Sequence, residues 1–201
     1  MIYKKNKLSI DGIKVDFIAK KFTTPIYCYS FKKLKDNIKN FKDNFKKVDP
    51  LICFAVKSNA NIKILNEIKK LKLGADVVSI GELMKALKVG INPRKIVFSG
   101  IGKTTTELEY AINKRILLIN TESKSEILEI ERIAKSKKRK VNIGIRINPN
   151  IDADTISQIS TGKKENKFGV DEKIFLELIK YLKNSKFLNL KCLSVHIGSQ
   201  I

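Results

Sequence analysis

The fold is decided by the stretch Leu51-Ile-Cys-Phe-Ala-Val-Lys-Ser-Asn-Ala60. Its apolar run from Leu51 to Val56, with proline before it and polar residues after it, is typical of a buried strand in a parallel sheet. Lys57 stands at the carboxyl end of this strand, although lysine is almost never buried without a partner. Because side chains alternate between the faces of a strand, Lys57 shares a face with the small residues Ala55 and Cys53.

Two interpretations of Lys57 are consistent with this pattern. In a (β/α)8 barrel, the bulky face of Ile52, Phe54 and Val56 packs against the helices and the small face points inward. Lys57 then projects into the carboxyl-terminal mouth, where the active sites of such barrels lie. Alternatively, Lys57 is an ordinary strand-end lysine whose ammonium group reaches solvent.

Length and composition indicate a soluble globular protein. The 201 residues are enough for one sizeable core, but fewer than the roughly 250 of a complete barrel. No apolar run has the length of a membrane span, and the amino terminus lacks the apolar core of a signal peptide, so no membrane partner is expected. The cysteines have no metal-binding spacing, and they predict reduced thiols in the cytoplasm; they are Cys28, Cys53 and Cys192.

The net charge of +21 raises the question of a nucleic-acid partner. Nearly all of the basic residues are lysines, and only five are arginines. Nucleic-acid sites favour arginine interleaved with aromatic residues. The lysines here are spread along the polar faces of several expected helices, so we predict no dedicated nucleic-acid role.

Strand and helix signals alternate at roughly 20 to 25 residues, the rhythm of βα units around a parallel sheet. Six strands are expected, at residues 51–56, 75–79, 95–100, 116–120, 141–147 and 190–197. Helices are expected before the first strand and between the others, with caps or capping boxes at Ser30, Thr104, Ser123 and Asp171. We therefore predict an α/β fold, namely a TIM-type (β/α)8 barrel that is incomplete, with about six βα units present. Before these units, Asp11-Gly12 between alternating apolar residues predicts a hairpin.

The alternation that places Lys57 applies equally to two later strands. Arg146 shares a face with Gly144, and His196, the single histidine, shares a face with Ser194. A lone histidine is more often structural than functional. However, core packing does not explain why a lysine, an arginine and a histidine converge on one barrel mouth.

Such a mouth suits an anionic ligand. A lysine held among apolar walls has a lowered pKa and a free amine, as Schiff-base chemistry requires. Pyridoxal 5′-phosphate is an aldehyde that carries a phosphate, and it satisfies both requirements.

Several motifs in order resemble one enzyme family. They are Phe54-Ala-Val-Lys-Ser-Asn, Gly74-Ala-Asp-Val-Val-Ser, Gly81-Glu-Leu, Ile96-Val-Phe-Ser-Gly-Ile-Gly-Lys-Thr, Gly144-Ile-Arg-Ile-Asn-Pro, Ile159-Ser-Thr-Gly-Lys-Lys-Glu-Asn-Lys-Phe-Gly and His196-Ile-Gly-Ser-Gln-Ile. The set is similar to that of fold-type III, alanine-racemase-like pyridoxal-phosphate decarboxylases, from about Thr24 to the last residue. The Lys57 motif and His196-x-Gly-Ser by themselves indicate only the wider family, which includes ornithine and arginine decarboxylases. The loop at 159–169 and the terminal Gly-Ser-Gln-Ile resemble the diaminopimelate decarboxylase branch.

The resemblance implies roles for individual residues. Lys57 forms the Schiff base with pyridoxal 5′-phosphate, His196 stacks on the cofactor ring, and Ser199 helps to hold its phosphate. Asp76 and Arg146 line the cofactor pocket.

Two further residues are open to two interpretations each. Glu82 belongs to the pocket or merely to the first turn of its helix, where a carboxylate is favoured. Lys167 lies near the mouth or is a solvated loop lysine.

The resemblance also implies a reaction and a domain organisation. The activity is decarboxylation of meso-diaminopimelate to L-lysine in lysine biosynthesis, by a homodimer. Residues 25–201 form a partial cofactor-binding barrel, and residues 1–24 pair with a C-terminal β domain that the chain lacks. We expect an open barrel with an unpaired edge, inactive by itself. Another basic amino-acid decarboxylase and a non-catalytic or truncated cofactor-binding barrel remain as alternatives.

Overall fold

The computed structural model describes residues 2–4, 6–45, 47–151 and 168–198. The chain divides into two compact units, Met1–Pro50 and Leu51–Ile201. Within the described ranges, no helix has the length and apolar character that crossing a membrane requires.

The first unit contains the predicted hairpin. Strands β1 (Ile2–Lys4), β2 (Lys7–Ile10) and β3 (Ile13–Lys14) form an antiparallel sheet. Asp11 and Gly12 between β2 and β3 have φ angles of 49° and 84°, and positive values at both positions characterise the tight turn that asparagine or aspartate followed by glycine favours.

Two helices complete this unit. Helix α1 (Val15–Phe22) was not predicted, because it spans only 8 residues and its N-cap Lys14 offers no capping side chain. Helix α2 (Phe31–Asn44) begins as predicted at Ser30, whose Oγ accepts a hydrogen bond from the Lys33 amide at 2.9 Å. The division at Pro50 groups α2 with the hairpin, and the expected boundary after residue 24 stays a prediction.

The second unit is built on one parallel sheet of six strands, which confirms the predicted α/β fold. The strands lie in chain order: β4 (Cys53–Ala55), β5 (Gly74–Val77), β6 (Ile96–Phe98), β7 (Leu118–Thr121), β8 (Val141–Arg146) and β9 (Leu188–Ser194). Among the described residues β4 and β9 are the two edges. The barrel is therefore open, as expected.

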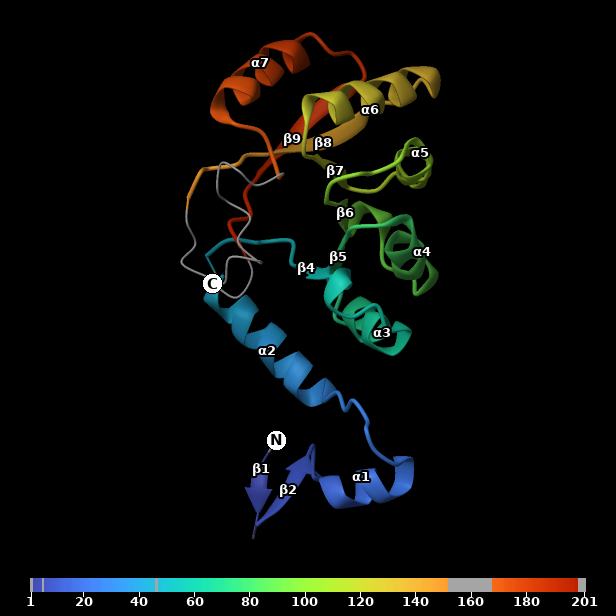
Figure 1. The fold of residues 1–201 in the computed structure, drawn as a ribbon, viewed down its shortest axis with the longest axis vertical. Helices are drawn as coiled ribbons and strands as arrows, with labels where there is room; N and C mark the ends of the chain where they lie inside the picture. Colours follow the sequence, from blue (N-terminus) through green and yellow to red (C-terminus); the bar gives the residue numbers. More distant parts are fainter. Residues whose placement is uncertain (1, 5, 46, 152–167, 199–201) are drawn as a thin grey trace. The chain divides into compact units, whose positions relative to one another are not determined.

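Helices follow the strands in turn and cover the sheet (Figure 1). They are α3 (Ile62–Lys70), α4 (Ile80–Lys88), α5 (Thr105–Lys114), α6 (Lys124–Ser136) and α7 (Glu172–Lys183), with short 3-10 turns η1 (Val56–Ser58) and η2 (Pro93–Lys95). The predicted capping box of α5 is present, with reciprocal bonds between Thr104 and Glu107. Fully buried apolar side chains fill the core, among them Leu65, Leu83, Phe98, Ile130 and Ile143.

Strand β9 departs from regular pairing at one point. Ile143 pairs with Leu190 and Gly144 with Cys192, so Lys191 is an extra residue in β9. Such a bulge resets the alternation of side chains. The residues from Cys192 onward follow the bulge, and the alternation used to place His196 therefore holds.

Candidate active site

A cavity of about 490 Å³ lies at the carboxyl ends of the strands. The structure brings four of the predicted residues together in its lining: Lys57, Asp76, Arg146 and His196. They come from the ends of β4, β5, β8 and β9, which is where the active sites of barrel enzymes lie. The predicted convergence is present.

Two other predicted residues, Ser199 and Lys167, lie outside the described residues, as does most of the loop at 159–169. Glu82 stands in the first turn of α4, and its Oε2 accepts a hydrogen bond from the Val78 amide at 2.9 Å. The structure therefore supports the interpretation of Glu82 as a first-turn carboxylate of its helix.

Lys57 belongs to the turn η1, directly after strand β4. The Ser58 Oγ donates to the Ala55 carbonyl at 2.7 Å, and the fully buried Val56 anchors the turn. The Lys57 side chain is exposed, and its ammonium makes no hydrogen bond or ion pair within the described part of the chain. The cavity that Lys57 lines also contains apolar side chains, among them Val78, Phe168 and Val195.

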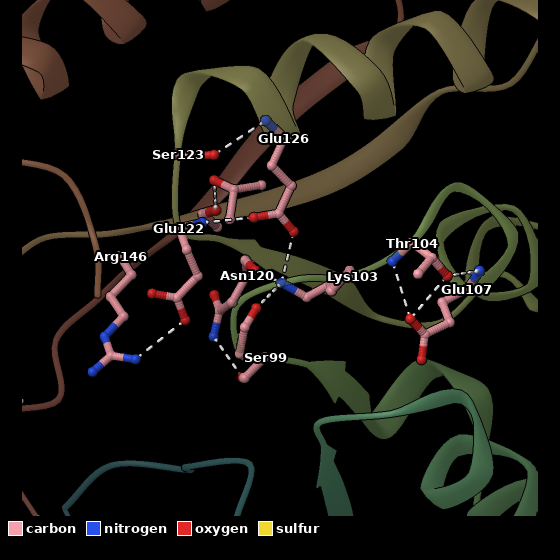
Figure 2. A network of polar contacts seen from close by, with 12 residues as sticks. Ser99, Lys103, Thr104, Glu107, Asn120, Glu122, Ser123, Glu126 and Arg146 are labelled. Atoms are coloured by element: carbon pink, nitrogen blue, oxygen red, sulfur yellow. Dashed lines mark hydrogen bonds and ion pairs between the residues drawn. The ribbon is translucent and has the colours of Figure 1, made fainter. Parts of the chain in front are cut away.

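Asp76 is held by a chain of two hydrogen bonds. The Ser99 Oγ donates to Asp76 Oδ1 at 2.5 Å. The Asn120 Nδ2 donates to Ser99 Oγ at 3.2 Å, a bond that is drawn in Figure 2. Since a hydroxyl has one hydrogen, the bond from Asn120 leaves the Ser99 proton for Asp76. Burial raises the pKa of the Asp76 carboxyl, while the bond from Ser99 and the charge of Lys57 oppose that rise.

Asn120 fits beside the sheet because its neighbour in β8 has no side chain. Gly144 pairs with Asn120 on one side and with Cys192 on the other. A Cβ atom on Gly144 would lie 2.2 Å from Asn120 Oδ1 and 3.2 Å from Cys192 Cβ. Glycine at this position therefore leaves room for the amide that orients Ser99.

Arg146 is tied to neighbouring strands. Its Nη1 donates to Glu122 Oε1 and its Nη2 to the His196 carbonyl, both at 3.1 Å. The side chains of Arg146 and Glu122 are only 12% and 4% exposed, and the pair is visible in Figure 2. The Phe168 ring lies 4.7 Å from the guanidinium carbon. The sequence predicted a positive charge at Arg146 for an anionic ligand. In the structure the Glu122 carboxylate neutralises that charge.

A second buried ion pair lies beside this one. The Lys103 side chain is 1% exposed, and its Nζ donates to the Gly100 and Asn120 carbonyls at 2.5 and 2.8 Å and to Glu126 Oε1 at 2.7 Å. These contacts tie the ends of β6 and β7 to the start of α6 (Figure 2).

His196 lies two residues after β9, with an exposed side chain. Partial burial, followed by the positive charges of Arg146 and Lys57, lowers the pKa of its imidazole below the ordinary value of 6.5. The imidazole is therefore mostly neutral at pH 7, and it presents an uncharged aromatic face.

Residues 31–201 match the family described as pyridoxal-dependent decarboxylase, pyridoxal binding domain. The chain belongs to the pyridoxal-dependent decarboxylases. Since the matched domain is the one that binds the cofactor, pyridoxal 5′-phosphate is the cofactor of this fold. The resemblance seen in the motifs is confirmed.

Individual relatives narrow the similarity further. The chain is 52% identical over 180 residues to the diaminopimelate decarboxylase of Helicobacter pylori strain J99, covering 90% of this chain and 44% of that protein. It is 45% identical to the Campylobacter jejuni diaminopimelate decarboxylase, covering 92% and 46%. The crystal structure of the H. pylori enzyme complexed with L-lysine superposes with a TM-score of 0.90 at 49% identity, covering 93% and 48%. The chain thus spans about half the length of these relatives.

The described residues of this decarboxylase domain fit the cofactor. Lys57 presents an amine that makes no hydrogen bond or ion pair with the described residues, and His196 presents a neutral ring. The cavity volume lies in the usual range for small-molecule sites, roughly 300–1,000 Å³.

Three polar side chains in the lining, Ser99, Asn120 and Glu122, were not predicted from the sequence. Ser99 and Asn120 are polar residues at the ends of expected strands, so the rule that selected Lys57 would have found them. Glu122 stands just before the N-cap of α6, and only its contact with Arg146, 24 residues later, reveals it.

Proposed function

We propose that this chain supplies the lysine-bearing half of the active site in a diaminopimelate decarboxylase, which removes one carboxylate of meso-diaminopimelate to give L-lysine. The observation that carries the proposal is the amine of Lys57, which has no partner within the described chain and shares one cavity with Asp76 and His196. The identity of the relatives at 45–52% supports the choice of substrate.

Each residue of the mouth has a physical task in this reaction. When bound, pyridoxal 5′-phosphate supplies an aldehyde and a ring that takes up the electron pair left by carbon dioxide. Lys57 offers its amine to the aldehyde. The neutral His196 offers a face for stacking without adding charge, and Asp76, oriented by Ser99, offers a carboxylate beside Lys57.

The proposal includes the assembly and the location of the protein. The resemblance supports a homodimer and lysine biosynthesis. Three free cysteines in the described chain support a reducing compartment, which we propose is the cytoplasm.

The experiment that tests this function is a decarboxylation assay on the protein in its natural length. Release of carbon dioxide from meso-diaminopimelate, with L-lysine formed in equal amount, is expected, and Lys57→Ala should abolish it. Arginine and ornithine are the comparison substrates. Faster turnover of either would favour another basic amino-acid decarboxylase. Cofactor binding without carbon dioxide from any substrate would favour a non-catalytic carrier.

A further inference from the structure

Glu122 is a buried carboxylate that the local structure does not require. It stands directly before the N-cap Ser123 of α6, where Val78 stands before the N-cap Ser79 of α4. The two helices are capped in the same way. The cap serine accepts a hydrogen bond from the amide of the glutamate three residues later, Glu82 in α4 and Glu126 in α6. The carboxylate of that glutamate accepts a hydrogen bond from the amide of the residue before the cap. The cap uses only the backbone of Glu122. The residue before an N-cap is commonly apolar, and before α4 it is Val78.

Both carboxylate oxygens of Glu122 are used at the mouth. Oε1 accepts from Arg146 Nη1 at 3.1 Å, and Oε2 accepts from the Gly169 amide at 3.0 Å. Gly169 has a φ of +75°, and a Cβ there would lie 2.8 Å from the Arg146 carbonyl. The chain therefore turns tightly at Gly169 against the end of β8, and Glu122 fixes both sides of that contact.

Two cavity-lining groups depend on these bonds. Arg146, which Glu122 holds, donates from its Nη2 to the His196 carbonyl. The centroid of the Phe168 ring lies 4.7 Å from the guanidinium carbon of Arg146. Phe168 also directly precedes the glycine that Glu122 holds. A buried ion pair contributes little net stability compared with apolar packing, and its best-attested use is to fix one arrangement.

We propose that Glu122 is a positioning residue of the mouth, which sets His196 and Phe168 around Lys57 by holding Arg146 with one oxygen and the Gly169 amide with the other. This inference rests on the proposed function, because the groups that it positions are those assigned to the cofactor. Glu122 acts through its partners and has no chemical role in the reaction.

The test compares two glutamates that are used alike. Glu122→Gln replaces one acceptor oxygen by an amide, which cannot accept from both Arg146 and Gly169. Glu107→Gln is the matched control, since the Glu107 carboxylate also uses both of its oxygens, Oε1 for the Ile80 amide and Oε2 for the amide and hydroxyl of Thr104. Glu107 is not among the described residues that line the cavity. Pyridoxal 5′-phosphate affinity is measured by absorbance titration at a temperature where circular dichroism shows each variant folded.

A weaker affinity for pyridoxal 5′-phosphate in Glu122→Gln, by about tenfold, is expected from the loss of a charge-assisted bond. Glu107→Gln should lower the melting temperature and leave the affinity unchanged. Glu122→Asp keeps the charge and should recover part of the affinity; it also replaces the glutamine variant if that one does not fold.

Affinity within twofold of the wild type in folded Glu122→Gln, or in Glu122→Asp where it replaces an unfolded glutamine variant, would overturn the inference and leave Glu122 with a structural role only. An equal loss of affinity in Glu107→Gln would overturn it as well, since general destabilisation would then explain both. A wild-type protein that binds no pyridoxal 5′-phosphate would instead refute the proposed function, and this inference with it.

Discussion

At the scale of single residues, the partly buried Asp76 carboxylate lowers the stability of the folded protein at neutral pH. Burial raises the pKa of its carboxyl above 3.8. Between 3.8 and that raised pKa the folded protein binds more protons than the unfolded chain. The contribution of Asp76 to stability therefore falls as pH rises through this window, and stays unfavourable at neutral pH.

Replacing Asp76 by asparagine should therefore separate folding from function. Asp76→Asn keeps the acceptor for Ser99 and removes the buried charge, so the melting temperature at pH 7 should be equal to or above that of the wild type. Its affinity for pyridoxal 5′-phosphate should fall. Thermal melts from pH 4 to 7 with a cofactor titration check both results, and a clear loss of stability at pH 7 would contradict this account of Asp76.

His196 is expected to matter for the cofactor more than for the fold, because its side chain is exposed. His196→Ala should weaken cofactor binding about fivefold, as expected for a stacking contact of about 1 kcal/mol. The wild type should also lose stability as pH falls below 6.5, since the pKa of the folded His196 is lowered and the unfolded chain takes up the proton first. This pH-dependent part should be absent in the alanine variant. An unchanged affinity with a large fall in melting temperature would indicate a structural histidine.

At the scale of elements, the positions of strands and helices in the second unit follow from the sequence. Apolar runs and helical periodicity predicted β4–β9 and α3–α7, and the side-chain alternation placed Lys57, Arg146 and His196 at one end of the sheet. The short helix α1 lacked a capping signal. Glu122 was missed because its partners, Arg146 and Gly169, are 24 and 47 residues away. For the same reason, the sequence could not show that the Arg146 charge is balanced.

Because Gly144 of β8 pairs with Asn120 of β7, a methyl group added at Gly144 should destabilise the fold. Gly144→Ala should displace the Asn120 amide, break its bond to Ser99, and cost about 1–3 kcal/mol of unfolding free energy, as overpacking typically does. Chemical denaturation measures this cost. Asn120→Ala in the same chain opens space for the new Cβ, so the double variant should be less destabilised than the two single costs added together. Strict additivity would show that the two residues do not conflict.

At the scale of the whole molecule, the open sheet leaves apolar side chains exposed at its edge. Leu193 and Val195 in and just after β9 are 55% and 57% exposed. Exposed apolar edge strands favour association between chains, and charged residues oppose it. The double variant Leu193→Lys/Val195→Lys should therefore reduce self-association of the 201-residue chain expressed by itself, as measured by light scattering. Equal scattering by the variant and the wild type would show that this edge does not drive association.

The assignment of Lys57 as the cofactor lysine has the most direct test. Borohydride reduction of the protein saturated with pyridoxal 5′-phosphate fixes the cofactor to the amine that holds it, and peptide mapping then identifies that amine. With lysine abundant among the 41 basic residues, non-specific reaction would spread the label over many peptides. We predict a single pyridoxyl label on the peptide containing Lys57, and its loss in Lys57→Arg. A label located on another lysine, or one that persists in the arginine variant, would contradict the account.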